Sequence, residues 1–277
     1  MLQRTLTAAV GIPVVVAAVW FGAPWLTILV AVLAVQGVRE LYRLQPRGIP
    51  PLPAALGVVW ALSLVVGAQS SSSLTSFLVI SCVILIVGTI ACLLWMIAYY
   101  TSGRPITASL YLIAGPVYVG FLLAHSLALR EIGDSFGEPS DAGRDWLLIT
   151  ILIVFATDTG AYLFGRAFGK RPLAPVISPN KTWEGAAGGF ISAVVIAIVV
   201  GYVLDLATPR WQQIVIGASV GVIAQLGDLF ESRLKRLSNI KDAGSIIPGH
   251  GGVLDRLDSV VVSIPLVYYL LATVFEP

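Results

Sequence analysis

The chain has 277 residues, of which 57% are hydrophobic and 12% charged, with a formal net charge of +2. Soluble domains carry about 25% charged residues, so the composition excludes a water-soluble globular protein and indicates that most of the chain lies in lipid. A net charge this close to zero gives no reason to expect a nucleic-acid partner.

Nine apolar segments that could cross a bilayer follow one another along the chain. One crossing needs about 20 apolar residues in a helix, and the segments occupy residues 6–22, 24–38, 52–68, 74–100, 107–129, 146–168, 185–204, 211–229 and 257–275. A single helix over the first two would reach about 50 Å, well beyond the roughly 30 Å hydrocarbon core. Gly22 and Pro24 lie between them, and proline interrupts helical hydrogen bonding, so we predict two helices. The first is expected to be a retained span rather than a cleaved signal peptide.

The basic residues predict the orientation of these spans. Cytoplasmic connections of membrane proteins carry an excess of Lys and Arg. With the N-terminus in the cytoplasm, all of the 17 Lys and Arg residues except Arg130, Arg144 and Arg210 fall on the cytoplasmic side. The sequence therefore predicts an all-α polytopic integral membrane protein with nine transmembrane helices, a cytoplasmic N-terminus and an external C-terminus.

Charged side chains gather in one window near the C-terminus. Residues 228–259 hold five acidic and five basic side chains, although the whole chain is only 12% charged. This is the composition of a site that holds metal and phosphate. We therefore divide the chain into a transmembrane scaffold, residues 1–145, and a region that carries the site, residues 146–277, with cytoplasmic loops at 169–184 and 230–256.

The spacing within this window predicts a metal site. Asp228, Ser232 and Lys235 are four and seven positions apart and share one helix face, and Asp255 and Asp258 are three positions apart at the start of the last span. Two helix ends on the same side of the membrane can aim three carboxylates into one volume. Mg²⁺ is bound by a few carboxylates together with phosphate oxygens and water.

Other residues of the window suit phosphate binding. The cationic candidates for neutralising phosphate charge are Lys235, Arg236, Lys241 and Arg256. Glycines allow backbone N–H groups to approach a phosphate closely, and the candidates are Gly249, Gly251 and Gly252. His250 could hold a phosphate or orient a carboxylate. The alternative interpretation of the whole window is a charged loop between two spans.

Asp158 lies inside an otherwise apolar span. An acidic residue in the hydrocarbon costs about 2.5–3.5 kcal/mol on insertion scales and marks a functional pathway or a buried pair. Counting back from Gly169 places Asp158 roughly 16 Å from the cytoplasmic end of its helix, a depth that suits the floor of a cytoplasmic cavity. The alternative is a structural hydrogen-bond acceptor that pairs with another span.

The loop after this span contains a candidate anion site. Asn180 or Thr182 can cap the next helix, and Lys181 lies beside the start of that helix, where anions bind. Gly185, Gly188 and Gly189 would let the helix pack closely on a neighbour. The alternative is an ordinary positively charged loop followed by a capped helix.

The C-terminal half, from about residue 150 onward, resembles the phosphatidate cytidylyltransferases, or CDP-diacylglycerol synthases. The family signature reads here as Ser232-x-x-Lys235-Arg236-x₄-Lys241-Asp242-x-Gly244-x₂-Ile247-Pro248-x-His250-Gly251-Gly252-x-x-Asp255-Arg256-x-Asp258. Two upstream segments are also similar to that family: Asp158-Thr159-x-Ala161-Tyr162 and Ser178-Pro179-x-Lys181-Thr182-x-Glu184-Gly185. Asn180 is a departure, since many members carry a lysine there.

The resemblance implies a nucleotidyltransferase that converts CTP and phosphatidate to CDP-diacylglycerol and pyrophosphate with Mg²⁺, and with K⁺ as a possible second cation. It implies a homodimer with a cavity open to the cytosol and to lipid, in a bacterial inner or plasma membrane. The expected catalytic residues are Asp228, Lys235, Arg236, Lys241, His250, Asp255, Arg256 and Asp258. The expected substrate-binding residues are Asp158, Ser178, Lys181, Thr182, Glu184, Ser232, Asp242, Gly251 and Gly252. The expected metal ligands are Asp228, Asp255 and Asp258.

Two other functions fit parts of the sequence. A CTP-dependent kinase of a polyprenol or other lipid would also need a membrane scaffold and a nucleotide site, but it would release CDP rather than pyrophosphate. A secondary transporter could use Asp158 as an ion site. Transporters show broken helices and internal pseudo-symmetry, whereas the polar residues here gather on one face of the membrane.

Overall fold

The computed structural model describes residues 2–45, 48–98, 105–132, 142–206, 208–238, 240, 243–244, 246 and 251–275. Each of the nine predicted apolar segments contains a helix. The helices are α1 (Leu2–Phe21), α2 (Trp25–Arg43), α3 (Pro51–Gln69), α4 (Leu74–Ala98), α5 (Pro105–Ala114), η1 (Gly115–Phe121), α6 (Leu122–Arg130), α8 (Ala142–Phe168), α9 (Trp183–Val203), α10 (Arg210–Leu237), α11 (Leu254–Leu257), α12 (Val260–Tyr269) and η2 (Leu270–Val274).

Seven of these helical segments are long and apolar enough to cross a membrane, and two further apolar helices, Ala9–Phe21 and Val260–Val274, are shorter. The protein is therefore an all-α polytopic membrane protein. The predicted break in the first apolar run is confirmed, because α1 ends at Phe21 and α2 begins at Trp25. Pro24 and the positive φ of Gly22 separate the two helices.

The structure departs from the sequence prediction in residues 169–184, which were expected to form a loop. They contain an antiparallel hairpin of β1 (Pro172–Ala174) and β2 (Ser178–Thr182). Prolines at 172, 175 and 179 disfavour a helix here. β2 ends at Thr182 and α9 begins at Trp183, so the hairpin leads directly into α9. The backbone N–H of Trp183 donates to the carbonyl of Arg171 at 3.0 Å and joins the start of α9 to the start of the hairpin.

Two spans differ from uniform α-helices or from their predicted bounds. The 107–129 span widens into the π-helix η1, which has Pro116 in its first turn; proline removes an N–H from the helical ladder, which favours such a local change. The eighth span was predicted to end near residue 229, but α10 continues to Leu237. Ser232 and Lys235 consequently lie on the same helix as Asp228, as their spacing predicted, whereas the loop expected from residue 230 begins after Leu237.

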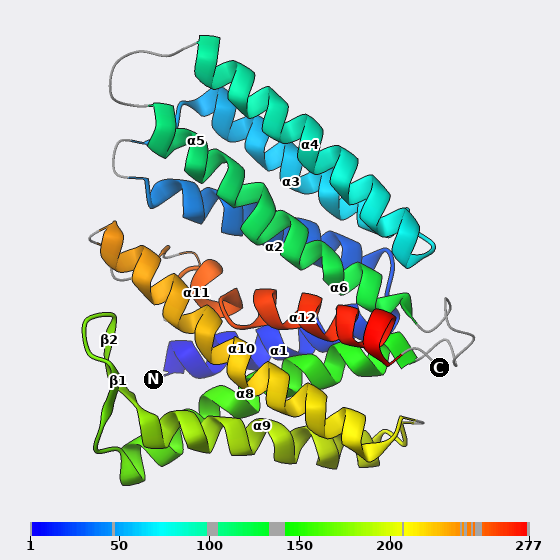
Figure 1. Cartoon of the computed structure of the whole chain (residues 1–277), viewed down its shortest axis with the longest axis vertical. Helices are drawn as coiled ribbons and strands as arrows, with labels where there is room; N and C mark the ends of the chain where they lie inside the picture. Colours follow the sequence, from blue (N-terminus) through cyan, green and yellow to red (C-terminus); the bar gives the residue numbers. More distant parts are fainter. Residues whose placement is uncertain are drawn as a thin grey trace.

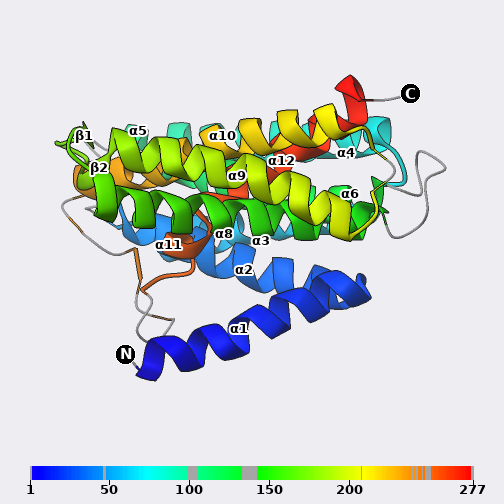
Figure 2. The ribbon, with the colours of Figure 1, turned by 90° about the horizontal axis from the view of Figure 1, so that it is seen from below.

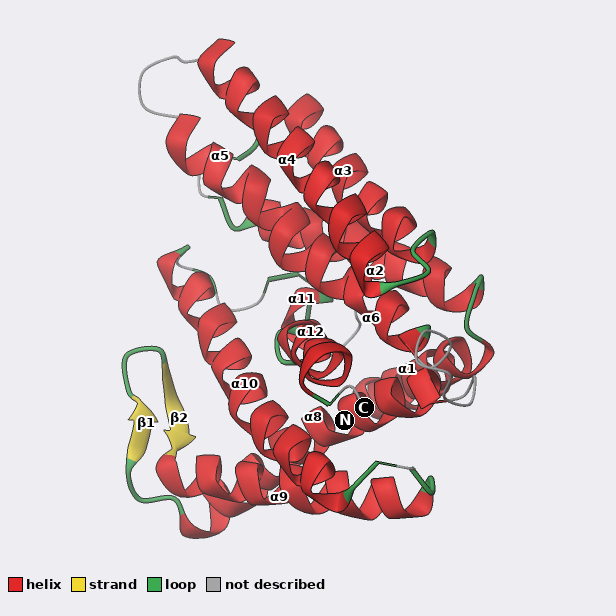
Figure 3. Cartoon of the chain, turned by 45° about the vertical axis from the view of Figure 1, so that its right-hand side comes forward, coloured by secondary structure: helices red, strands yellow, loops and turns green. Residues whose placement is uncertain are grey.

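The helices form two groups with α12 between them. Figure 1 shows α2 to α6 on one side and α8 to α10 on the other, and Figure 3 shows α12 enclosed between α10 and the α2–α6 group. In Figure 2, α1 lies at the edge of the bundle beside α2. The hairpin, the C-terminal end of α10 and α11 lie toward the same end of the bundle in both views (Figures 1 and 2). This end gathers the polar elements of the C-terminal half.

Glycines allow α8 and α9 to pack closely. A Cβ at Gly160 would lie 2.2 Å from the Oγ of Ser192, and a Cβ at Gly189 would lie 2.8 Å from the carbonyl oxygen of Thr157. Both distances are too short for any side chain larger than hydrogen. The predicted close packing through Gly188 and Gly189 is confirmed, and it fixes the position of α9 and of the hairpin that precedes it.

Gly189→Val is therefore expected to destabilise the protein. Overpacking a close contact costs about 1–3 kcal/mol, which corresponds to a loss of roughly 5 °C in melting midpoint for a chain of this size. The matched control is Gly11→Val in α1, because a Cβ at Gly11 meets no atom within 4 Å. Thermal unfolding of both variants in detergent measures the effect. Equal midpoints would show that the α8–α9 contact is not tight.

Candidate active site

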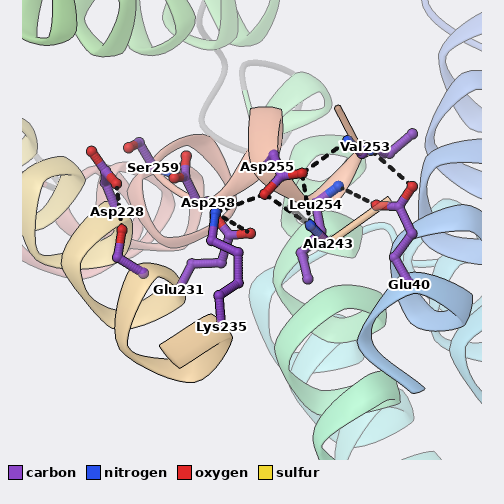
Figure 4. Close-up of polar contacts among 12 residues, drawn as sticks. Glu40, Asp228, Glu231, Lys235, Ala243, Val253, Leu254, Asp255, Asp258 and Ser259 are labelled. Carbon is purple, nitrogen blue, oxygen red and sulfur yellow. Dashed lines mark hydrogen bonds and ion pairs between the residues drawn. The ribbon is translucent and has the colours of Figure 1, made fainter. Parts of the chain in front are cut away.

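Many of the predicted site residues come from two segments that face each other. Asp228, Ser232 and Lys235 lie along the C-terminal part of α10, together with Glu231. Asp255, Asp258 and Ser259 lie on α11 and at the start of α12. Figure 4 shows the α10 side chains pointing toward those of α11 and α12. The helical spacing of the sequence therefore does bring these residues to one interface.

Lys235 joins the two elements. Its Nζ lies 2.7 Å from Oδ1 of Asp255 on α11 and 3.3 Å from Oε1 of Glu231, one turn earlier on α10. The Glu231 side chain is fully buried. Removing one member of a buried ion pair leaves the other charge without compensation. Loss of Lys235 or of either carboxylate is therefore expected to disturb the other two groups.

The Asp255 carboxylate is held on several sides. Oδ2 accepts hydrogen bonds from the backbone N–H of Gly252 at 2.8 Å and of Ala243 at 3.0 Å, while Oδ1 accepts from Lys235. Burial alone would raise the pKa of Asp255, but the hydrogen bonds from Lys235 and these two N–H groups lower it below its usual value. Asp255 is therefore an anion that fixes the Gly251–Gly252 segment, where Gly251 has a φ of +86°.

A second ion pair links α10 to the hairpin. The Nζ of Lys181 on β2 lies 2.6 Å from Oδ2 of Asp228, and the hydroxyl of Ser232 donates to Oδ1 of Asp228 at 3.3 Å. Lys181 precedes the N-cap of α9, Thr182, whose Oγ1 accepts from the N–H of Gly185 at 3.1 Å. The predicted cap is thus Thr182, and it places Lys181 against the end of α10.

Glu184 shapes the same corner. Its Oε2 accepts hydrogen bonds from the backbone N–H groups of Lys170 at 3.0 Å and Arg171 at 3.2 Å. The side chain thereby ties the end of α8 to the start of α9 and holds the base of the hairpin. Glu184, which was predicted to bind substrate, therefore lies at the base of the hairpin that carries Lys181.

Asp158 extends the cluster into the membrane-spanning part of α8. It lies within electrostatic reach of Asp258, Asp228, Lys181 and Arg256. Asp258 accepts a hydrogen bond from the N–H of Ser259 at 2.7 Å. Acidic and basic side chains from α8, β2, α10 and α11 therefore meet in one region.

The three predicted metal ligands do not form one three-carboxylate group. No cluster of three or more His, Cys, Asp or Glu side chains with metal-binding geometry occurs among the residues that the structure describes. Asp228 and Asp258 lie near each other, whereas Asp255 is turned toward Lys235 and the loop (Figure 4). Mg²⁺ takes one or two carboxylates and completes its shell with phosphate oxygens and water. The oxygen donors of Asp228 and Asp258 fit such an ion.

Of the remaining predicted residues, Arg236 and Ser178 lie at the hairpin, and three others lie outside the described part of the chain. Arg236 reaches the hairpin, where its Nε donates to the carbonyl of Ile177 at 3.4 Å, and Ser178 begins β2. Lys241, Asp242 and His250 lie outside the described residues.

The chain matches the family model for the cytidylyltransferases over residues 2–274. It belongs to the cytidylyltransferase family. A protein of Bacillus subtilis (strain 168) named phosphatidate cytidylyltransferase is 32% identical over 276 residues, 98% of each chain. Proteins of the same name match from Staphylococcus haemolyticus, at 32% identity over 98% of this chain and 99% of that one, and from Staphylococcus saprophyticus, at 46% identity over 48% and 52%.

Two residues of this cytidylyltransferase that touch the site were not predicted. Glu231 follows Asp228 by three positions and precedes Lys235 by four, so helical spacing alone could have included it. Glu40 on α2 is fully buried and accepts hydrogen bonds from Val253 and Leu254. The only sequence feature that could have indicated a role for Glu40 is its place, as an acidic residue, at the end of an apolar segment. Nothing in the sequence pointed to partners more than 200 residues away.

Proposed function

We propose that this protein transfers CMP from CTP to phosphatidate, giving CDP-diacylglycerol and pyrophosphate. Its membership of the cytidylyltransferase family and its full-length likeness to proteins named phosphatidate cytidylyltransferase support this activity. The observation that carries the proposal is the pairing of Lys181 with Asp228 and of Lys235 with Asp255 at one end of the spans. The two lysines supply positive charge that can neutralise phosphates, and the two aspartates supply negative charge that can hold cations.

The chemistry matches these residues. A phosphate oxygen of phosphatidate is already anionic and attacks the α-phosphorus of CTP, while the bond from that phosphorus to the β-phosphate oxygen breaks and pyrophosphate leaves with the electron pair. No strong general base is needed. The main barrier is the approach of two polyanions, which cationic side chains lower by positioning and charge neutralisation.

Each part of the site has a proposed role. Lys181, at the helix start beside the membrane, binds the phosphate of the lipid. Lys235, Arg236 and Arg256 neutralise the phosphates of CTP and the departing pyrophosphate. Asp228 and Asp258 would hold Mg²⁺, which would supply further neutralisation of the transferring and leaving phosphates. Asp255 keeps Lys235 and the Gly251–Gly252 segment in place, a role that we propose in place of the metal ligation expected from its spacing and from the family resemblance.

The proposal extends to membrane placement. Nine spans, with the N-terminus in the cytoplasm and the C-terminus outside, place the site where CTP is available. The distribution of Lys and Arg supports this orientation, and so does the clustering of the hairpin, the end of α10 and α11 at one end of the bundle (Figure 1). A homodimer in a bacterial inner or plasma membrane, with K⁺ as a second cation, completes the proposal.

Product identification tests the activity. Purified protein is incubated with phosphatidate, Mg²⁺ and CTP labelled on either the α- or the γ-phosphate. We expect the α-label in a CDP-lipid and the γ-label in pyrophosphate. A γ-label on the lipid together with release of CDP would instead identify a lipid kinase. Ion-coupled solute flux in vesicles, without any dependence on nucleotide, would identify a transporter.

A further inference from the structure

The N-terminal half contributes one acidic side chain to the loop that carries Asp255. Glu40 lies in the last turns of α2 and is 0% exposed. Its Oε1 accepts from the backbone N–H of Val253 at 3.0 Å, and its Oε2 accepts from the N–H of Leu254 at 2.8 Å. Figure 4 shows Glu40 reaching this backbone from the side opposite Asp228 and Asp258. Both carboxylate oxygens are therefore used to hold the start of α11.

The loop approaches Glu40 closely because two of its residues are glycines. A Cβ at Gly244 would lie 2.4 Å from Oε1 of Glu40, and a Cβ at Gly252 would lie 2.5 Å from Oε2. No larger residue fits at either position without displacing the carboxylate. The two glycines thus form, together with the N–H groups of Val253 and Leu254, a cradle around Glu40.

The same backbone segment holds the Asp255 carboxylate on its other side. Gly252, which belongs to this cradle, and Ala243, which precedes Gly244, donate their N–H groups to Asp255, and Asp255 in turn binds Lys235 at 2.7 Å. A displacement of residues 252–254 would therefore move Asp255 and release Lys235. Hydrogen bonds to a charged acceptor are shorter and stronger than neutral ones, so a carboxylate is suited to fix this backbone where an amide is not.

We propose that Glu40 is a positioning residue for the transfer reaction. It clamps residues 252–254 and acts through them on Asp255 and Lys235, without contacting either substrate. The transmembrane scaffold thereby becomes part of the active site, since α2 sets the geometry of a loop in the C-terminal half. The proposal rests on the proposed function, because the reaction is its readout.

The test uses Glu40→Gln, whose amide keeps the size of the side chain but can accept at only one of its two ends. Loss of a supporting contact of this kind lowers activity by about 10–100-fold, and we expect that fall in kcat, with a smaller change in the KM for CTP. Glu131→Gln, at the far end of α6, is the matched control and should retain wild-type kinetics. A Glu40→Gln enzyme with roughly half or more of the wild-type kcat would overturn the proposal.

A double-mutant cycle separates positioning from general destabilisation. If Glu40 acts through Asp255, Glu40→Gln should change the residual activity of an Asp255→Asn enzyme by no more than roughly twofold. Full additivity of the two losses would refute the coupling. Should Glu40→Gln fail to accumulate as folded protein, Gly244→Ala disturbs the same contact from the loop side and enters the same cycle.

Hydrogen exchange gives a readout that does not depend on catalysis. The amides of Val253 and Leu254 should exchange slowly in the wild-type protein and quickly in Gly244→Ala, while those of α9 remain unchanged. Rapid exchange of both amides in the wild type would show that the clamp does not form. If the wild-type protein makes no CDP-lipid yet protects these amides, the proposed reaction fails while the clamp itself stands.

Discussion

Replacing Asp255 with asparagine is expected to lower CDP-diacylglycerol formation by about a hundredfold or more, comparable to the loss when one hydrogen-bond donor that stabilises transition-state charge is removed. Asp255 accepts hydrogen bonds from Lys235, Gly252 and Ala243 at once. An asparagine has one oxygen in place of two and presents an N–H₂ group to a donor. Lys235 would then lose its 2.7 Å partner and stay paired only with Glu231 at 3.3 Å.

The loss should fall on catalysis more than on folding. A hydrogen bond to a charged group contributes about 1.5–3 kcal/mol, which a protein with 5–15 kcal/mol of stability can tolerate. The amount of folded protein and its melting midpoint are measured alongside the initial rate at saturating CTP and phosphatidate. Asp205→Asn is the matched control, because Asp205 is exposed and follows the opposite end of α9 from Lys181. Near-wild-type turnover by Asp255→Asn would remove Asp255 from the site.

Local periodicity explains why much of the site could be predicted. Asp228, Ser232 and Lys235 lie on one face because α10 is a continuous helix to Leu237, and a continuous helix makes residues four and seven positions apart neighbours. The break between α1 and α2 also follows from a local signal, since Gly22 and Pro24 act on their own backbone. Thr182 could be named as a cap because capping depends only on adjacent residues.

The pairings across the bundle could not be predicted in the same way. Lys181 meets Asp228 because a hairpin carries it there, and three prolines gave no indication of strand pairing. Asp255 was expected to bind metal from its spacing and from the family resemblance, and neither signal pointed to its contacts with Lys235, Gly252 and Ala243, which depend on how α11 packs on α10 and on the loop. Glu40 finds Val253 and Leu254 only when α2 packs against α11. Long-range packing decides each of these contacts.

Asp228 presents the sharpest test of the site, because it could serve either to pair with Lys181 or to hold a metal. These two roles predict different results for one double variant. Asp228→Asn alone is expected to lower turnover by about a hundredfold or more, a free-energy loss of roughly 2.7 kcal/mol. The side chains of Lys181 and Asp228 are 25% and 33% exposed, and an ion pair with that much solvent contributes only about 0.2–1 kcal/mol to stability. Loss of the pair is therefore too small to lower turnover by unfolding the protein.

The charge-swapped protein, Lys181→Asp with Asp228→Lys, should recover the melting midpoint of the wild type but not its activity. The swap restores two opposite charges across the 2.6 Å contact, yet it removes the carboxylate that α10 places beside Asp258. Raising Mg²⁺ should partly rescue Asp228→Asn, whose Asp258 ligand remains, and should leave the swapped protein inactive. Titrating Mg²⁺ against initial rate for the wild type and the three variants (Lys181→Asp included) measures this. Recovery of activity in the swap would mean that Asp228 serves only to hold Lys181 and that the metal lies elsewhere.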